Sequence, residues 1–290
     1  MFLSYISSKR WELLIELRNL WVRYPNRDKF ILRGVNLEIS TDGIYLIVGK
    51  TGCGKTTLAR VLVGLIPHIF YAEVSGEVRV LGEDPIKNGP GTLAGKVAYV
   101  SQNPELFISS ITVEEELYLP LINLGLKPED MKRRVEYVVK TLKLGDLINR
   151  STLELSSGQL QLIALASAIA TGAKVLVLDE PLSRLDPDNY IRFIKALSEV
   201  STGRIILVFE HHLDYLVELA NKIIVLKDGT VAAQGSLDDV AELLLDINIP
   251  ELLEYAVIFR GRGCIDRIPK SLNEFLVMIE NAIKHKECVV

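Results

Sequence analysis

The chain has 290 residues, enough for one large domain with a small appendage. Hydrophobic residues make up 49% of it and charged residues 24%, a composition typical of a packed globule that excludes a disordered chain. No apolar run approaches the roughly 20 residues that span a bilayer, and a net charge of -4 without a long basic run argues against nucleic acid as the main partner.

The N-terminal quarter predicts strands and a turn. The apolar stretch at 1–6 comes before Lys9 and Arg10, the reverse of a secretory signal, so we expect the chain in the cytosol. Apolar runs at 13–17 and 32–39 flank a segment at 24–28 whose composition favours a turn.

The run at 49–56, Gly-Lys-Thr-Gly-Cys-Gly-Lys-Thr, matches G-x-x-x-x-G-K-[ST], a loop that wraps phosphates. Its glycines let the backbone curl and aim N–H groups at an anion. Lys55 can neutralise the β- and γ-phosphate oxygens, and Thr56 can offer its hydroxyl to Mg²⁺. An apolar strand at 44–48 and a helix at 57–63 flank the loop, which favours this interpretation over a chance match. The predicted nucleotide-binding residues of the loop are Gly49, Lys50, Thr51, Gly52, Cys53, Gly54, Lys55, Thr56 and Thr57.

The middle of the chain changes character twice. A strand at 75–81 and a Gly- and Pro-rich loop through Gly95 suggest an antiparallel layer beside the nucleotide core. Residues 112–150 predict a mostly helical insert, because 114–121 and 128–144 combine helical spacing with dense charge.

The C-terminal half predicts a parallel sheet with helices on both faces, because helical and strand patterns alternate from residue 160. In order, these segments are 160–170, 175–178, 189–200, 205–209, 213–219 and 223–226. Beyond about residue 240 we expect only helices. The last of them, at 271–284, gathers Leu272, Phe275, Leu276, Ile279 and Ile283 on one face.

Two carboxylates follow the apolar strand at 175–178. Ligands of a parallel sheet bind at the carboxyl ends of its strands, so Asp179 and Glu180 should emerge beside the phosphate loop. Asp179 could then hold Mg²⁺ through a water molecule, and Glu180 could polarise the attacking water. A solvated acidic strand end is the simpler interpretation of this segment alone; the phosphate loop favours the functional one.

The segment 155–159, Leu-Ser-Ser-Gly-Gln, alone predicts only a capped helix. Together with 49–56 and 175–180 it resembles the LSGGQ signature of ATP-binding cassette (ABC) ATPases. Further motifs of that family follow its order: Tyr24 matches the adenine-stacking aromatic residue, Gln102 the Q-loop, 183–186 the D-loop with Asp186, and His211 the switch histidine. The resemblance covers residues 12–240.

This resemblance implies a P-loop NTPase fold of the α/β class. Its parts would be a RecA-like core with a mainly parallel sheet, an antiparallel β subdomain, a helical signature subdomain at about 103–170 and a C-terminal helical extension at 241–290, with a possible role in dimerisation. Two cassettes would pack head to tail with each ATP between one phosphate loop and the partner's signature, formed by Ser156, Ser157, Gly158 and Gln159. The implied catalytic residues are Lys55, Gln102, Glu180 and His211, and those for Mg²⁺ are Thr56, Gln102 and Asp179.

Three segments, 102–107, 112–116 and 120–126, look like those of the energy-coupling factor (ECF) type. Those ATPases power uptake of vitamins, cobalt or nickel. The resemblance implies a second ATPase subunit, identical or paralogous, and transmembrane partners whose coupling helices enter a groove beside Gln102. The chain would then lie on the inner face of the cell membrane.

This chain departs from the family pattern at two positions. Ser157 stands where the signature has its second glycine, and we expect its small side chain to fit. Leu162 stands where many relatives carry arginine, and nothing in the sequence gives the consequence. His212 adjoins His211, but the position of His211 directly after Glu210 favours His211 as the switch residue.

Four other functions compete with this interpretation. A GTPase would carry N/T-K-x-D, which 221–224 fails at its last position, and a small-molecule kinase would not need the signature, D-loop and switch histidine together. A non-transport ABC ATPase shares every catalytic motif. It would more often carry paired cassettes, a coiled-coil insertion or basic runs. A regulatory subunit with weak hydrolysis is suggested by Ser157 and opposed by the presence of Glu180 and His211.

Overall fold

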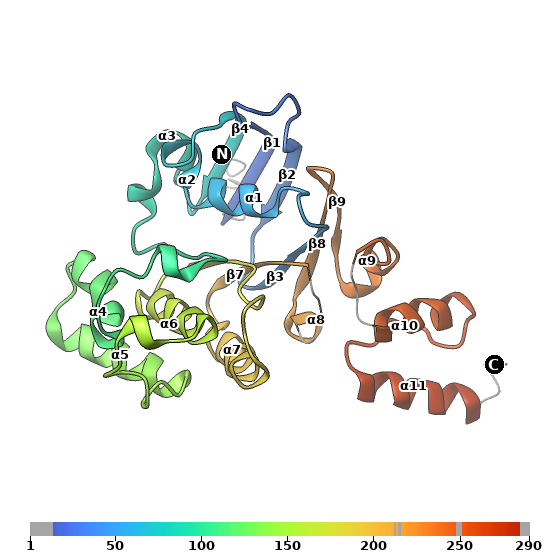
Figure 1. The fold of residues 1–290 in the computed structure, drawn as a ribbon. Helices are drawn as coiled ribbons and strands as arrows, with labels where there is room; N and C mark the ends of the chain where they lie inside the picture. The colour runs from blue at the N-terminus through green and yellow to red at the C-terminus, as the bar shows by residue number, and fades with distance from the viewer. Residues whose placement is uncertain (1–13, 212, 214–215, 248–250, 285–290) are drawn as a thin grey trace, which may run out of the picture.

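The computed structural model describes residues 14–211, 213, 216–247 and 251–284. Its central element is a six-stranded sheet in the order β5-β6-β7-β3-β8-β9 (Figure 1). The strands are β5 (Val97–Val100), β6 (Val175–Asp179), β7 (Ile205–Glu210), β3 (Gly43–Val48), β8 (Lys222–Lys227) and β9 (Thr230–Gly235). All neighbouring strands are parallel except β8 and β9.

The three central strands are buried along their whole length, which is why they consist almost entirely of apolar residues. Alternate side chains enter different cores. On one face, Leu46, Leu176 and Val208 join the helices α6 (Ser157–Ala170) and α7 (Pro187–Val200). On the other face, Ile47 and Phe209 join α1 (Lys55–Leu62) and the second sheet.

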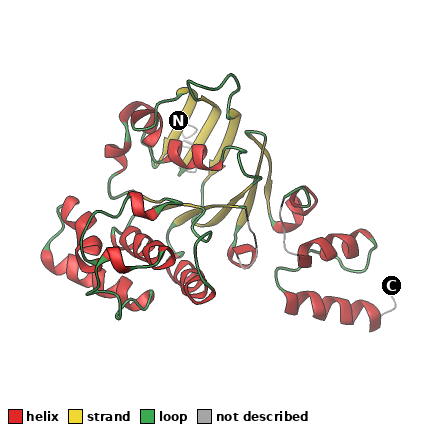
Figure 2. Ribbon diagram, viewed as in Figure 1, coloured by secondary structure: helices red, strands yellow, loops and turns green. Residues whose placement is uncertain are grey.

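That second sheet is antiparallel, in the order β2-β1-β4. It consists of β2 (Leu32–Ile39), β1 (Ile15–Arg23) and β4 (Glu73–Val80), and it lies beyond α1 from the main sheet (Figure 2). The short helix α2 (Leu65–His68) follows α1. A second short helix, α3 (Pro85–Asn88), and a 3₁₀ turn at Pro90–Leu93 follow β4.

The helical insert forms a separate cluster beside the main sheet (Figure 1). It contains α4 (Val113–Asn123) and α5 (Pro128–Thr141), which pack against α6, with 3₁₀ turns at Pro104–Leu106 and Thr152–Glu154. After β7 come α8 (Leu216–Leu219), α9 (Leu237–Leu244), α10 (Glu251–Gly261) and α11 (Leu272–Lys284).

The fold class predicted from the sequence is confirmed: a mainly parallel core sheet, an antiparallel sheet and a helical cluster are all present. Several element limits were wrong. The first strand runs to Arg23 rather than ending at 17, because a bulge near Asn19 lets it pair past a polar break. The loop expected through Gly95 contains α3 and a 3₁₀ turn, and β9 was not predicted.

Candidate functional site

The phosphate loop lies between β3 and α1, as predicted. Its conformation requires glycine at two positions. Gly54 caps α1 with φ of 111°, a left-handed geometry that side chains rarely adopt. A Cβ at Gly49 would collide with the carbonyl oxygen of Leu226, so the loop closes against β8 only because that position is bare.

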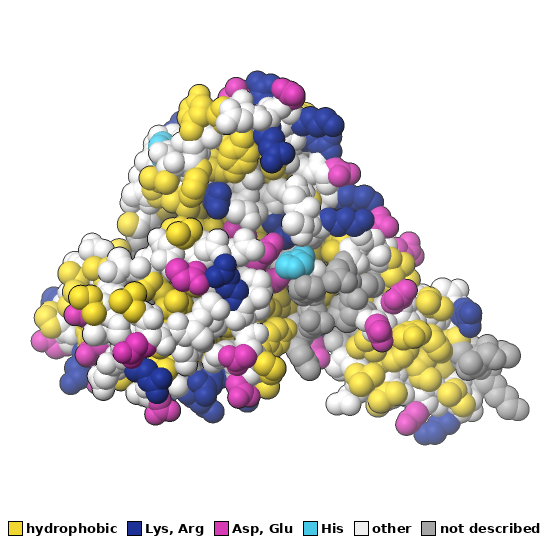
Figure 3. Space-filling model, in the orientation of Figure 1, with side chains coloured by type: hydrophobic (Ala, Val, Ile, Leu, Met, Phe, Trp, Pro, Cys, Tyr) yellow, Lys and Arg dark blue, Asp and Glu magenta, His cyan; other side chains and the backbone are white. Residues whose placement is uncertain are grey.

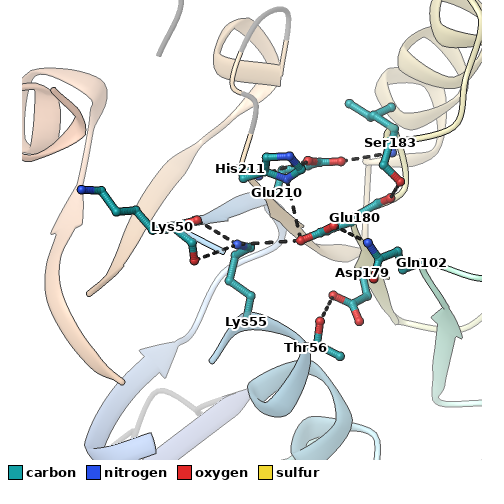
Figure 4. A network of polar contacts seen from close by, with 11 residues as sticks. Lys50, Lys55, Thr56, Gln102, Asp179, Glu180, Ser183, Glu210 and His211 are labelled. Carbon is teal, nitrogen blue, oxygen red and sulfur yellow. Dashed lines mark hydrogen bonds and ion pairs between the residues drawn. The ribbon is translucent and has the colours of Figure 1, made fainter. Parts of the chain in front are cut away.

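Lys55 begins α1 and its side chain is almost completely buried. Its Nζ donates a hydrogen bond to the carbonyl oxygen of Gly49 at 2.8 Å and lies 3.9 Å from Oε1 of Glu180 (Figure 4). The ammonium group is therefore held between the loop backbone and a carboxylate, where incoming phosphate oxygens could replace these contacts.

Asp179 ends β6 and is buried. Each of its oxygens accepts one hydrogen bond: Oδ1 from the Thr56 hydroxyl and Oδ2 from the Tyr99 hydroxyl, both at 3.0 Å. Burial raises the pKa of Asp179, and the two hydroxyl donors oppose that rise. A buried carboxylate of this kind favours a nearby cation.

Glu180 adopts a left-handed backbone conformation, with φ of 46°. Its N–H donates to the carbonyl oxygen of Phe209 at 2.8 Å, which fixes the residue to β7. Gln102 Nε2 donates to its Oε2 at 2.6 Å, and His211 Nδ1 lies 3.7 Å from its Oε1. Three predicted catalytic side chains therefore surround the Glu180 carboxylate: Lys55, Gln102 and His211.

Sequence reasoning did not propose Glu210 as part of the site. Glu210 is buried at the end of β7, where its Oε1 accepts from the N–H of Leu182 and its Oε2 from the N–H of His211, both at 3.1 Å. This carboxylate ties His211, the predicted switch residue, to the segment after β6. A charged residue at the end of an otherwise apolar strand was the available signal in the sequence. The alternative switch residue, His212, lies outside the described residues.

An open pocket of about 360 Å³ is lined by residues of the phosphate loop together with Gln102 and Glu180. Tyr24 stands at its wall, and its hydroxyl hydrogen-bonds the Thr57 hydroxyl at 3.2 Å. The lining is Tyr24, Arg27, Ile31, Thr51, Gly52, Gly54, Lys55, Thr56, Thr57, Gln102 and Glu180. Arg27 and Ile31 were not predicted. Gly49, Lys50 and Cys53 do not line this pocket; Lys50 and Cys53 face a neighbouring one.

These residues fit Mg²⁺ bound with a triphosphate. Thr56 and Gln102 each place an oxygen atom that could coordinate Mg²⁺ at the pocket wall. The Gln102 side-chain oxygen is available for this because the amide nitrogen, not the oxygen, binds Glu180. Asp179 lies behind Thr56 and does not line the pocket, which suits contact through a water molecule. Within the described residues no cluster of three His, Cys, Asp or Glu side chains could hold a metal ion by itself.

The signature residues lie elsewhere on the molecule. Ser156 caps α6, accepting from the N–H of Gln159, whose side chain accepts from the N–H of Ser156 in return. Gly158 abuts the D-loop carbonyl of Arg184, and Asp186 caps α7. None of the signature residues, 156–159, is among the residues that line the pocket.

The first departure from the family pattern, Ser157, begins α6 and is partly exposed, and its fit against a partner's nucleotide stays a prediction. The second, Leu162, is completely buried among apolar side chains of the main core. An arginine there would require a different environment.

Among the described residues, no helix has the length and apolar character needed to cross a bilayer.

Residues 32–183 of the chain match a family model described as ABC transporter. A putative ABC transporter ATP-binding protein of Pyrococcus horikoshii, PH1815, is 34% identical over 275 residues, covering 92% of this chain and 96% of that protein. A longer relative with the same description, from Treponema denticola, is 36% identical, and this chain spans 52% of its length.

Two solved structures are similar. CbiO1 from Clostridium perfringens, described as part of the ABC transporter complex cbiONQ, shares 25% identity and a TM-score of 0.67 over 84% of this chain and 98% of that one. The ATP-binding cassette MJ0796, solved as a dimer in a post-hydrolysis state with ADP and Pi, also shares 25% identity and a TM-score of 0.67, over 77% of this chain and 98% of that one.

Proposed function

The chain belongs to the family of ABC transporter ATP-binding proteins, and we propose that it hydrolyses ATP as the ATPase subunit of an ECF-type importer for a vitamin or metal ion. One observation carries the enzymatic part. The Glu180 carboxylate lies at the wall of the phosphate-loop pocket, in contact with Gln102 and within 4 Å of the side chains of Lys55 and His211. Similarity to CbiO1 supports the ECF assignment.

We infer a task for each of these side chains from its position in the site. Lys55 and the loop N–H groups bind the β- and γ-phosphates, and Tyr24 stacks on the adenine. Thr56 and Gln102, with Asp179 through water, hold Mg²⁺, which supplies neutralisation of the phosphate charge. Glu180 orients and polarises the attacking water. His211, tied to Glu210, contacts the γ-phosphate side of the site.

A second cassette completes the site. The pocket is open, and the capped start of α6 that carries Ser156 to Gln159 lies outside it. The positive N-terminal end of a helix favours phosphate, so we propose that this end binds ATP held by the partner subunit. The dimeric state of MJ0796 supports this geometry.

The extension at 241–290 is proposed to help join the two subunits. On α10 and α11, Tyr255, Ile258, Leu272, Leu276 and Val277 expose apolar surface, and Figure 3 shows hydrophobic side chains gathered there. Contact of these side chains with a second copy of the chain would remove their apolar area from water, which stabilises the dimer.

A membrane partner is proposed to bind a second apolar region, the docking surface, which we define as the exposed side chains of Leu106, Phe107, Ile111 and Ile122; the last two also line a groove. Leu106 is 77% exposed and Ile111 72%. Hydrophobic side chains gather over α4 in Figure 3. The groove, about 510 Å³, also contains Glu114 and Glu115, which suits an amphipathic helix with basic residues.

Replacement of Glu180 tests the hydrolytic role. We expect Glu180→Gln to bind ATP with wild-type affinity and to lose turnover by about 10²- to 10⁴-fold, because the amide cannot act as a base. Size-exclusion chromatography with Mg²⁺ and ATP should show an accumulating dimer. Glu129→Gln, at an exposed position of α5, is the matched control.

Normal hydrolysis by Glu180→Gln would remove this residue from the mechanism. A wild-type chain without any ATPase activity, alone or with its partners, would favour the regulatory alternative. A dimer that forms equally without ATP would point to the α10–α11 surface as its cause.

A further inference from the structure

Tyr99 is a polar side chain at the site that the proposed mechanism does not use. It lies on β5, the edge strand beside β6, where it pairs with Val177. Its hydroxyl donates to Oδ2 of Asp179 at 3.0 Å, while Thr56 donates to Oδ1 at the same distance. The orientation of the Asp179 carboxylate therefore depends on two hydroxyl groups, one from the phosphate loop and one from β5.

The other side of the Tyr99 ring meets Phe107. The two rings lie edge to face, with centroids 5.9 Å apart and an angle of 79° between their planes. Phe107 belongs to the docking surface and is 48% exposed. Along the chain, Gln102 lies between these two aromatic residues. One rigid ring thus connects the carboxylate behind the metal position to the surface proposed for a membrane partner.

We propose that Tyr99 is a positioning residue that transmits the state of Phe107 to the Asp179 carboxylate. A partner helix that covers Phe107 would fix the edge-to-face pair and hold the hydroxyl on Oδ2. When Phe107 is uncovered, the ring pair has fewer neighbours and the carboxylate is less firmly oriented. Docking would thereby favour the geometry that holds Mg²⁺.

The contacts that link Phe107 through Tyr99 to Asp179 do not depend on the proposed function. The binding of a membrane partner at Phe107 does rest on the proposed function. The experiment therefore uses the purified full chain without a partner, so the first connection is tested by itself.

The measured quantity is the Mg²⁺ concentration that gives half-maximal ATP turnover. Tyr99→Phe keeps the ring and its Phe107 contact but removes the hydroxyl. We expect it to raise this concentration about tenfold, the effect of losing a hydrogen bond to a charged group. ATP affinity in EDTA should stay within about twofold of the wild type, because the phosphate loop is unchanged. Tyr137→Phe, on α5, is the matched control.

A double-mutant cycle tests the transmission. Phe107→Ala should raise the half-maximal Mg²⁺ concentration about two- to tenfold, the range for loss of an aromatic pair. Tyr99→Phe combined with Phe107→Ala should show no larger shift than Tyr99→Phe alone, because Phe107 acts through the missing hydroxyl.

Two results of the Mg²⁺ titrations would overturn the proposal: a wild-type Mg²⁺ requirement in Tyr99→Phe, or shifts that multiply in the double variant. An equal loss of ATP affinity in EDTA would show a merely structural role and also overturn it. Failure of the proposed function looks different, since the wild-type chain itself would then not hydrolyse ATP.

Discussion

Asp179 shows how a single residue of this site opposes the stability of the fold. The carboxylate is buried, and burial raises its pKa although the Thr56 and Tyr99 hydroxyls oppose the change. A folded-state pKa above the unfolded value means that ionisation weakens the fold as the pH rises through the folded pKa. The carboxylate proposed to face the cation is therefore a source of instability when no cation is bound.

Asp179→Asn should accordingly stabilise the metal-free protein while abolishing turnover. In EDTA at about pH 7.5 we expect the melting temperature to rise by about 2 °C, the equivalent of about 1 kcal/mol for a chain of this size. The gain should shrink as the pH falls below the ordinary Asp pKa of about 4, where Asp179 becomes protonated in both states. Differential scanning calorimetry measures both, with the exposed Asp266→Asn as control; a lower melting temperature at the higher pH would refute the argument.

The motifs located most of the polar side chains of the site, but not Glu210 or Tyr99. Lys55, Thr56 and Asp179 have positions fixed by the phosphate loop and by the end of a buried strand, so a pattern finds them. Glu210 and Tyr99 gain their contacts from the order β5-β6-β7-β3 and its register, which a single sequence does not specify. The catalytic roles stay predictions until the variants are measured.

At the scale of elements, the fully buried strands of the main sheet were predictable to within one residue at each end, as the predicted strands at 44–48, 175–178 and 205–209 show against β3, β6 and β7. An alternating pattern also located an edge strand, since the strand at 32–39 agrees with β2 at both ends. β9 contains Ala233, Gln234 and Gly235, which have little strand preference, and it exists because β8 supplies an antiparallel partner. The limits proposed for the cassette, 12–240, and for its extension, 241–290, stay predictions.

The start of α6 is held against the D-loop more closely than its sequence indicates. A Cβ built on Gly158 would lie 3.0 Å from the carbonyl oxygen of Arg184. The Arg184 side chain in turn contacts Glu105 at 2.8 Å and also Asn103, both after Gln102. The signature, the D-loop and the Q-loop segment are thus in contact within one chain.

Gly158→Ala tests this contact. Alanine favours a helix, so stability should not fall, whereas the D-loop must shift by a few tenths of an ångström. We expect turnover to drop roughly tenfold because the shared site is displaced. Gly145→Ala is the matched control, since a Cβ there meets nothing within 4 Å. Wild-type steady-state turnover in Gly158→Ala would show that the D-loop accommodates the methyl group freely.

At the scale of the whole molecule, two cores stabilise the described part of the chain, and apolar regions stay uncovered on its surface. One core joins α6 and α7 to the main sheet, and the other joins α1 to the antiparallel sheet. Two of the uncovered regions are the docking surface and the outer side of α10 and α11, which lie in different parts of the molecule (Figure 3). Separate surfaces would allow a membrane partner and a second ATPase subunit to bind together.

The docking surface gives the prediction that separates transport from a non-transport ATPase. In cells that naturally encode the chain, we expect the wild-type protein to sediment with washed membranes. Ile111→Lys combined with Ile122→Lys should move most of it to the supernatant, because each variant removes an apolar contact and places a positive charge against the basic helix proposed to bind there. Both isoleucines are well exposed, so the melting temperature should barely change. Ile191→Lys, at a similarly exposed position of α7, should stay with the membranes. A wild-type chain found in the supernatant would instead favour the non-transport alternative, with the ATPase site unaffected by that result.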